Sequence, residues 1–132
     1  MLRNSKNFIP ELSLVAIEDN KIVGYILFTK VKIGDYEEIA LAPLAVLPEF
    51  QKKGIGGSLI KKGHEIAKKL GYHYSIVIGS EKYYPKFGYV PAIKYGIKAP
   101  FQVDNENFMA VKLNNSIMEI KDIVEYAKEF GI

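Results

Sequence analysis

The feature that most constrains the fold is a glycine-rich turn that joins an apolar run to an amphipathic run. Residues 39–47 (IALAPLAVL) are apolar at successive positions, which is typical of a strand covered on both faces. After the turn, apolar or small residues recur every three or four positions and lysines occupy the positions between them, which predicts an amphipathic helix. The recurring residues are Ile55, Leu59, Gly63, Ile66 and Leu70, and Gly71 is placed to end the helix.

A second apolar run, residues 74–80 (YSIVIGS), follows this helix. A strand, a helix and a second strand in this order predict a parallel pair joined by a crossover helix. Residues 12–18 and 22–33 are β-branched runs around a short Asp-Asn turn, and they predict an antiparallel hairpin. We therefore expect a mixed α/β fold, and the 132 residues fit one domain spanning 1–132.

The remaining segments are less sharply patterned. Residues 107–113 alternate as a strand does, and residues 81–89 predict a helix of one or two turns that closes at Gly88. For the tail from Ser116, the sequence fits either a helix or a short strand. Helical spacing connects Ile117, Ile120, Ile123, Val124 and Ala127, whereas the sequence IVEY at 123–126 equally fits a short strand.

Pro43 interrupts the apolar run at 39–47. Proline has no N–H group to donate to a strand ladder, so it marks a bulge or a place where strand pairing opens.

Composition excludes several classes of chemistry. The chain has no cysteine, which excludes disulfides, thiolate metal sites and a cysteine nucleophile. The formal net charge is +3, which suits a small polyanionic ligand but is too weak to indicate nucleic acid. No apolar run has the length of a membrane span, and the N-terminus has no signal-peptide pattern. We expect a cytoplasmic protein without a metal, a membrane or a nucleic-acid partner.

The turn itself has the composition of an anion site. Gly54, Gly56 and Gly57 carry no Cβ, so a pyrophosphate could approach the first N–H groups of the helix, with Lys52 and Lys53 beside them. The plain alternative is a helix entrance that happens to contain glycines. Neither the G-x-G-x-x-G fingerprint nor the Gly-Lys-Ser/Thr of a P-loop is present.

The pattern Gln-x-x-Gly-x-Gly, from Gln51 to Gly56, together with the later YYPKFGY at 83–89, resembles the GCN5-related N-acetyltransferase (GNAT) superfamily. More narrowly, the two motifs at this separation resemble YhbS-like acetyltransferases. The resemblance runs from about Leu12 to Leu113. It implies a mixed central sheet in which an antiparallel hairpin adjoins a splayed parallel pair with a crossover helix.

The same resemblance implies acetyl-CoA as cosubstrate and an acetyl transfer in which a primary amine attacks the thioester directly. The amine could belong to a small molecule, a peptide N-terminus or a lysine. The implied cofactor contacts are the strand backbone at Leu44, Ala45, Val46 and Leu47, the turn residues Gln51, Lys52, Lys53, Gly54, Ile55, Gly56, Gly57 and Ser58, and the neighbouring Tyr83.

For catalysis, Tyr84 stands four residues before Gly88 and Tyr89, where the resemblance implies a proton donor to the leaving thiolate. A phenol is protonated at neutral pH and can serve this purpose; the alternative is a packing aromatic. Glu38, at the start of the central strand, could act as a base through water, although a solvated strand-end charge is the simpler interpretation. We expect His64 and His73 to be surface residues, and Glu81 is as weak a candidate as Glu38.

Family members usually begin with a strand and one or two helices that help to form the acceptor pocket, whereas eleven residues precede Leu12 here. We therefore expect an incomplete acceptor pocket, an exposed edge strand and self-association, with a dimer as the simplest form. A CoA-binding or protein-binding member without catalysis remains an alternative. A third possibility is a nucleic-acid module built on Lys61, Lys62, Lys68 and Lys69, which the small net charge disfavours.

Overall fold

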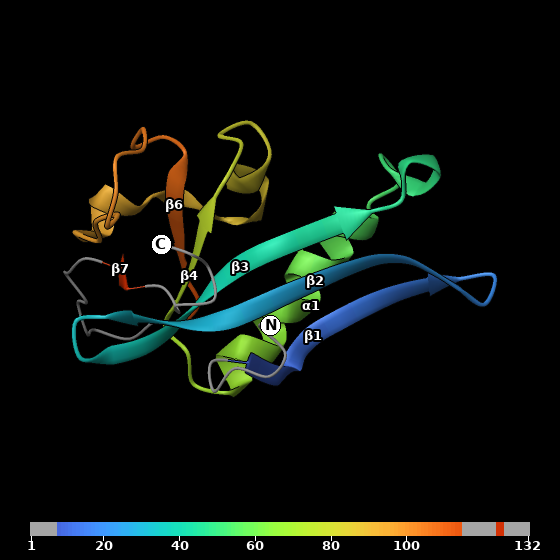
Figure 1. The fold of residues 1–132 in the computed structure, drawn as a ribbon, viewed down its shortest axis with the longest axis horizontal. Coiled ribbons are helices and arrows are strands. Elements are labelled where there is room, and N and C mark those ends of the chain that lie inside the picture. Colours follow the sequence, from blue (N-terminus) through green and yellow to red (C-terminus); the bar gives the residue numbers. More distant parts are fainter. Residues whose placement is uncertain (1–7, 115–123, 126–132) are drawn as a thin grey trace.

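The structure is a computed structural model that describes residues 8–114 and 124–125. In chain order, its elements are β1 (Phe8–Glu18), β2 (Lys21–Ile33), β3 (Tyr36–Val46), η2 (Pro48–Phe50), α1 (Ile55–Lys69), β4 (Tyr74–Ile78), η3 (Tyr84–Phe87), β5 (Val90–Pro91), η4 (Ala92–Tyr95), β6 (Phe108–Lys112) and β7 (Val124–Glu125). The strands form one sheet in the order β1-β2-β3-β4-β6-β5, and β7 pairs with β2 (Figure 1). The predicted mixed α/β fold is confirmed.

The first three strands form an antiparallel meander, and β3 pairs with β4 in parallel through the crossover helix α1. Asp19 and Asn20, between β1 and β2, adopt φ angles of 52° and 62°. Asp and Asn tolerate this left-handed region better than most residues, and two such residues suit a tight hairpin turn. The predicted hairpin and the predicted parallel pair are both present.

The parallel pair opens after a short stretch. Its registered pairs are Ile39 with Ser75 and Ala40 with Ile76, and the two strands then diverge (Figure 1). On the other side of β3 the register shifts, since Leu41 lies opposite Phe28 whereas Leu44 lies opposite Ile26. The extra residue falls at Ala42–Pro43, so the irregularity predicted at Pro43 is confirmed.

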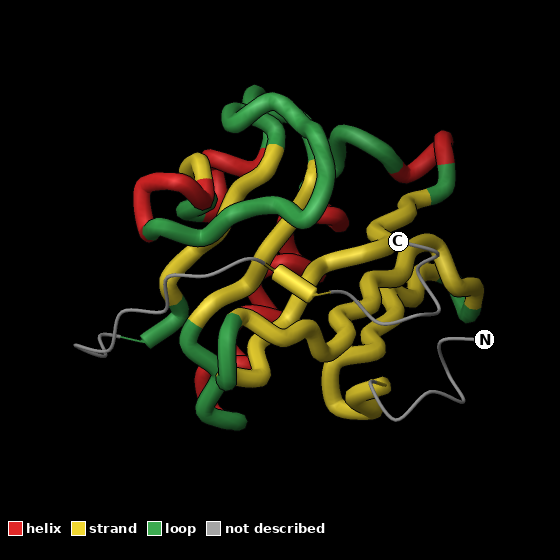
Figure 2. Tube along the Cα trace, turned by 60° about the vertical axis from the view of Figure 1, so that its left-hand side comes forward, coloured by secondary structure: helices red, strands yellow, loops and turns green. Residues whose placement is uncertain are grey.

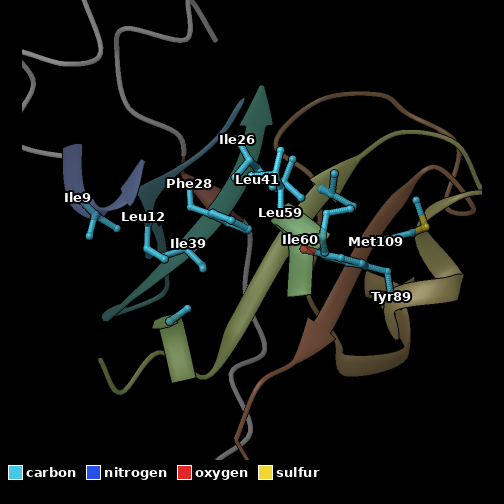
Figure 3. Close-up of a cluster of buried hydrophobic side chains, with 12 residues drawn as sticks. Ile9, Leu12, Ile26, Phe28, Ile39, Leu41, Leu59, Ile60, Tyr89 and Met109 are labelled. Atoms are coloured by element: carbon cyan, nitrogen blue, oxygen red, sulfur yellow. The ribbon is translucent and has the colours of Figure 1, made fainter. Parts of the chain in front are cut away.

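Helix α1 covers one face of β1, β2 and β3, and the main core lies between them (Figure 3). The helix buries Leu59, Ile60, Gly63 and Ala67. A Cβ on Gly63 would lie 2.3 Å from the Phe28 ring, so the helix approaches the sheet closely only because this position has no side chain. Leu70, which the periodicity placed in the buried stripe, is instead 44% exposed because the helix has ended at Lys69. Gly71, at φ +92°, follows the C-cap as predicted.

A second core lies on the opposite face of the sheet and includes Ile33, Ile76, Phe108 and Val124. The strand predicted at 107–113 is β6, and the short helix predicted at 81–89 is the 3-10 helix η3, followed by Gly88 at φ +93°. The sequence of the tail fits either a helix or a short strand, and in the structure Val124–Glu125 form the short strand β7, visible in Figure 2 as the yellow piece between grey traces. Ile117, Ile120, Ile123 and Ala127 lie outside the described residues.

None of the helices within residues 8–114 combines the length and the apolar character that a membrane crossing needs. Within the described ranges, no three His, Asp or Glu side chains gather closely enough to hold a metal ion.

Candidate functional site

A groove of about 730 Å³ lies at the end of β3, where the glycine turn leads into α1. Its walls are the last residues of β3, the turn, the first turns of α1 and the 3-10 helix η3. The lining residues are Leu44, Val46, Phe50, Gln51, Lys52, Gly54, Ile55, Gly56, Gly57, Ser58, Lys61, Tyr83, Lys86 and Phe87. The groove thus brings together residues from both sequence motifs, although 26 residues of chain separate Gly56 from Tyr83.

The start of α1 presents free N–H groups to this groove. Gly54 is the N-cap at φ +83°, no side chain caps the helix, and no acidic residue occupies its first turn. The first intrahelical bond runs from the Ser58 N–H to the Gly54 carbonyl, at 3.0 Å. The preceding N–H groups of Gly54, Ile55, Gly56 and Gly57, which we call the N–H cradle, therefore have no partner within the helix. They lie at the positive end of the helix dipole, where an anion is stabilised.

The backbone N–H of Ser58 is already used within the helix, so the cofactor contact that the resemblance implies for this residue falls to its side chain. Its exposed side chain still lines the groove, so its hydroxyl is the group that remains available.

The end of β3 presents alternate residues to the groove. The Leu47 N–H donates to the Val23 carbonyl at 2.8 Å, which shows that the backbone of Leu47 faces β2. Because backbone direction alternates along a strand, Ala45 also faces β2, whereas Leu44 and Val46 face the opening toward β4. Leu44 and Val46 line the groove; Ala45 and Leu47 do not.

Gln51 ties the turn to this strand. Its side-chain amide donates to the Val46 carbonyl at 3.0 Å, so the glutamine of the Gln-x-x-Gly-x-Gly pattern holds the turn against the end of β3. The signature glutamine thus has a clear local function in shaping the groove.

Lysines around the site fall into groups with different surroundings. Lys52, Lys61 and Lys86 line the groove. Lys53 instead lies over the Phe50 ring, with its Nζ 5.3 Å from the ring centroid. Lys62 and Lys69 form exposed ion pairs with Glu65 at 3.6 and 3.7 Å. The four lysines considered as one nucleic-acid face therefore do not act as a unit, since Lys61 turns into the groove.

Four lining residues were not singled out as cofactor contacts from the sequence: Phe50, Lys61, Lys86 and Phe87. Two of them could have been predicted from their spacing to residues that were singled out. Lys61 lies one helical turn after Gly57, and Lys86 lies three residues after Tyr83.

The adjacent tyrosines of the second motif have separate positions. A Cβ added to Gly56 would meet the Tyr83 hydroxyl at 2.8 Å, so this hydroxyl lies over the N–H cradle. A Cβ added to Gly79 would lie 2.4 Å from the Tyr84 ring, so Tyr84 packs on the chain just after β4, beside the open end of the parallel pair. Burial raises the pKa of both phenols, and Tyr83 raises that of Tyr84 further.

A buried hydrogen-bonded chain lies beneath Tyr84. The Tyr89 hydroxyl is 2.7 Å from Ser75 Oγ and 2.9 Å from His64 Nε2, and the Tyr89 ring packs edge-on against Tyr84. The prediction that His64 is a surface residue is wrong, because its ring packs between Phe28 and Tyr89. Burial lowers the pKa of His64 to about 4 and raises that of Tyr89 above its usual range.

Glu38 is not the solvated strand-end charge that the sequence suggested, because it is fully buried. Its carboxylate accepts the N–H groups of His73 and Tyr74 at 2.7 and 3.0 Å and contacts His73 Nδ1 at 3.1 Å. His73, predicted on the surface, is partly buried by this contact. Glu38 stands beside Tyr74 at the start of β4, whereas Tyr84 packs on Gly79, about 16 Å further along the strand direction. The structure therefore does not bring the two predicted catalytic residues together.

Glu81 is exposed and lies in the loop after β4. Its carboxylate accepts a hydrogen bond from Asn107 Nδ2 at 2.9 Å. A hydrogen bond from its own backbone N–H, and then that of Asn107, lower the pKa of this carboxyl group.

Known proteins resemble this chain in sequence and in fold. The model of the acetyltransferase (GNAT) family matches residues 3–89. The uncharacterized N-acetyltransferase YjhQ of Escherichia coli strain K12 is 41% identical over 103 residues, which are 74% of this chain and 57% of YjhQ. The uncharacterized N-acetyltransferase YhbS of the same strain is 25% identical over 91% of this chain and 74% of YhbS.

Among solved structures, the GNAT family N-acetyltransferase YhbS of Escherichia coli in complex with CoA matches with a TM-score of 0.85 and 23% identity, over 91% of this chain and 69% of that chain. A GNAT family acetyltransferase of Brucella melitensis in complex with acetyl-CoA matches with a TM-score of 0.69 and 30% identity, over 89% of this chain and 67% of that chain. The sequence pattern, the splayed sheet and these matches agree, and the chain belongs to the acetyltransferase (GNAT) family.

Proposed function

We propose that this protein is an acetyl-CoA-dependent N-acetyltransferase that acts on a primary amine. The observation that carries the proposal is the continuous groove that joins the N–H cradle to Leu44 and Val46 at the opening between β3 and β4. Relatives with the same fold are crystallised with CoA or acetyl-CoA, which supports the same cosubstrate here.

The residues of the groove fit the parts of CoA. The N–H cradle and Lys52 suit the pyrophosphate, because both favour negative charge and the glycines allow close approach. The backbone N–H and C=O of Leu44 and the N–H of Val46 suit the amides of the pantetheine arm, since both residues face away from β2, whereas the Val46 carbonyl already accepts a hydrogen bond from Gln51. Ala45 and Leu47 are left out of this contact because their backbone groups face β2.

In the proposed reaction, the amine nitrogen attacks the carbonyl carbon of the thioester. The C–S bond then breaks and leaves an amide and a thiolate, and Tyr84 donates its phenolic proton to that thiolate. Burial keeps the phenol protonated at neutral pH because it raises the pKa of Tyr84. We assign loss of the amine proton to water rather than to Glu38, whose carboxylate is buried and bonded to the loop before β4.

The sequence has no cysteine, which is compatible with a reducing compartment, and we place the proposed activity in the cytoplasm. A CoA-binding protein without transferase activity is the alternative. Because the chain spans 57% of the length of YjhQ, the activity of the whole relative is not assumed for it.

The test is a pair of measurements on the full chain. Isothermal calorimetry with CoA should show one site per chain, and release of free thiol from acetyl-CoA should depend on an added primary amine from a panel of small amines and peptides. Binding without amine-dependent thiol release from any member of the panel would favour the non-catalytic alternative. Absence of CoA binding would contradict both.

A further inference from the structure

Three lysines line the groove, and the proposed function uses only one of them. Lys52 belongs to the turn, Lys61 to α1 and Lys86 to η3. No acidic residue occurs among the groove-lining residues that the structure describes. The groove therefore carries about three positive charges, more than a pyrophosphate on a helix N-terminus requires.

Lys61 and Lys86 are not engaged in ion pairs within the described part of the chain. Other lysines nearby are engaged: Lys62 and Lys69 pair with Glu65, and Lys53 lies over Phe50. Lys86 lies over the Tyr83 ring, with its Nζ 5.7 Å from the centroid, an arrangement that holds its ammonium group at the groove wall without neutralising it.

The two lysines occupy facing walls. Phe87 of η3 contacts the start of α1 so closely that a Cβ on Gly57 would lie 3.0 Å from its ring. Lys86 precedes Phe87, and Lys61 follows Gly57 by one turn, or about 6 Å along the helix axis. Both lysines belong to the α1 and η3 walls rather than to the β3 wall, where the pantetheine arm is placed.

CoA carries a second anionic group besides its pyrophosphate. This is the 3′-phosphate of the ribose, a monoester that carries a charge of about −1.5 to −2 at neutral pH. Lys61, one helical turn after Gly57 on α1, and Lys86, next to Phe87 on the η3 wall, supply two positive charges that match it. We propose that Lys61 and Lys86 bind the 3′-phosphate and select CoA over nucleotides that lack it. This inference rests on the proposed function and adds that the protein recognises the 3′-phosphate of the cosubstrate.

The test compares CoA with 3′-dephospho-CoA by calorimetry at one low ionic strength. The unchanged protein should bind CoA on the order of tenfold more tightly, as charge-assisted contacts to phosphate predict. The double variant K61A/K86A should lose most of this preference while its affinity for 3′-dephospho-CoA stays nearly the same. Each single variant should lose part of the preference.

Two variants serve as controls. Lys68→Ala removes an exposed lysine of α1 outside the groove and should leave both affinities unchanged. Lys52→Gln should lower the affinity for CoA and for 3′-dephospho-CoA by the same factor, because both contain the pyrophosphate.

The outcomes separate the two claims. Equal binding of the two nucleotides by the unchanged protein, or a preference that survives in K61A/K86A, would overturn this inference and leave the proposed function standing. A protein that binds neither nucleotide would overturn both.

Discussion

Tyr83 and Tyr84 are neighbours in sequence with rings 5.1 Å apart and nearly perpendicular, yet they face different groups. Tyr83 lines the groove and its hydroxyl lies over Gly56, at the N–H cradle. Tyr84 does not line the groove; its ring packs on Gly79 and against the buried Tyr89. Under the proposed function, Tyr83 would contact the bound cosubstrate, and Tyr84 would lie near the thioester at the opening of the parallel pair.

These positions predict different results from the same substitution. Tyr84→Phe should lower kcat on the order of 10²-fold, because the leaving thiolate loses its proton donor, while the Kd for CoA stays nearly unchanged. Tyr83→Phe is the matched control: it removes a hydroxyl over the cradle, so it should weaken CoA binding and change kcat little. Steady-state kinetics measures kcat and calorimetry measures the Kd for CoA in both variants. Unchanged turnover in Tyr84→Phe would remove Tyr84 from the mechanism.

At the scale of elements, the sequence predicted the unit of β3, the turn, α1 and β4 well. The signals there are local: apolar periodicity, glycines at the start and end of the helix, and a proline within the strand. They describe local backbone preferences, which can be recognised without knowing the distant partners of each residue. The bulge at Pro43 is the best example, because a missing N–H group has the same consequence in any sheet.

The sequence did not predict the burial of several charged and polar side chains, because that burial depends on partners distant in the sequence. Glu38 is buried because it bonds His73 and Tyr74, more than thirty residues later. His64 is partly buried because its ring packs between Phe28 and Tyr89, and it is hydrogen-bonded to Tyr89. A helical signal for His64 did exist, since it follows the buried Ile60 by four residues and precedes the buried Ala67 by three. Because histidine is polar, we expected it on the surface in spite of this spacing.

The contact of His64 with Tyr89 joins α1 to the second motif and predicts a pH dependence of stability. The pKa of His64 is lowered from 6.5 to about 4 by burial, so the folded protein holds the neutral ring. Between these two values the unfolded chain binds more protons, and the free energy of unfolding must therefore fall as pH falls from 6.5 toward 4. The loss from this residue reaches at most about 3 kcal/mol.

Urea unfolding from pH 8 to pH 4 measures this effect. In His64→Gln the side chain can still hydrogen-bond Tyr89 but does not titrate. The difference in unfolding free energy between the unchanged protein and the variant should therefore stay constant from pH 8 to about 6.5 and then change progressively toward pH 4, to the disadvantage of the unchanged protein. Parallel curves for the two proteins would show that His64 does not titrate with a lowered pKa.

At the scale of the whole molecule, the two faces of the sheet differ. Helix α1 covers the β1-β2-β3 face that carries Leu12, Ile26 and Phe28. On the opposite face, near the turn between β1 and β2, large apolar side chains remain exposed: Val15 at 48%, Ile17 at 62%, Ile22 at 59% and Tyr25 at 43%. They form neighbouring cross-strand pairs, Val15 with Tyr25 and Ile17 with Ile22, and β1 is the edge of the described sheet.

An exposed apolar patch on an edge strand favours association with another chain, and we predict that the occupant is a second copy, because the free N–H and C=O groups of one β1 edge complement those of another. Sedimentation at tens of micromolar should show dimer. Ile17→Lys should shift the protein toward monomer, because a charge in the patch would be desolvated on association. Ile93→Lys is the matched control, since Ile93 is 46% exposed on η4, away from β1, and it should leave the dimer intact. If the unchanged protein sediments as a monomer throughout this range, the patch does not mediate self-association.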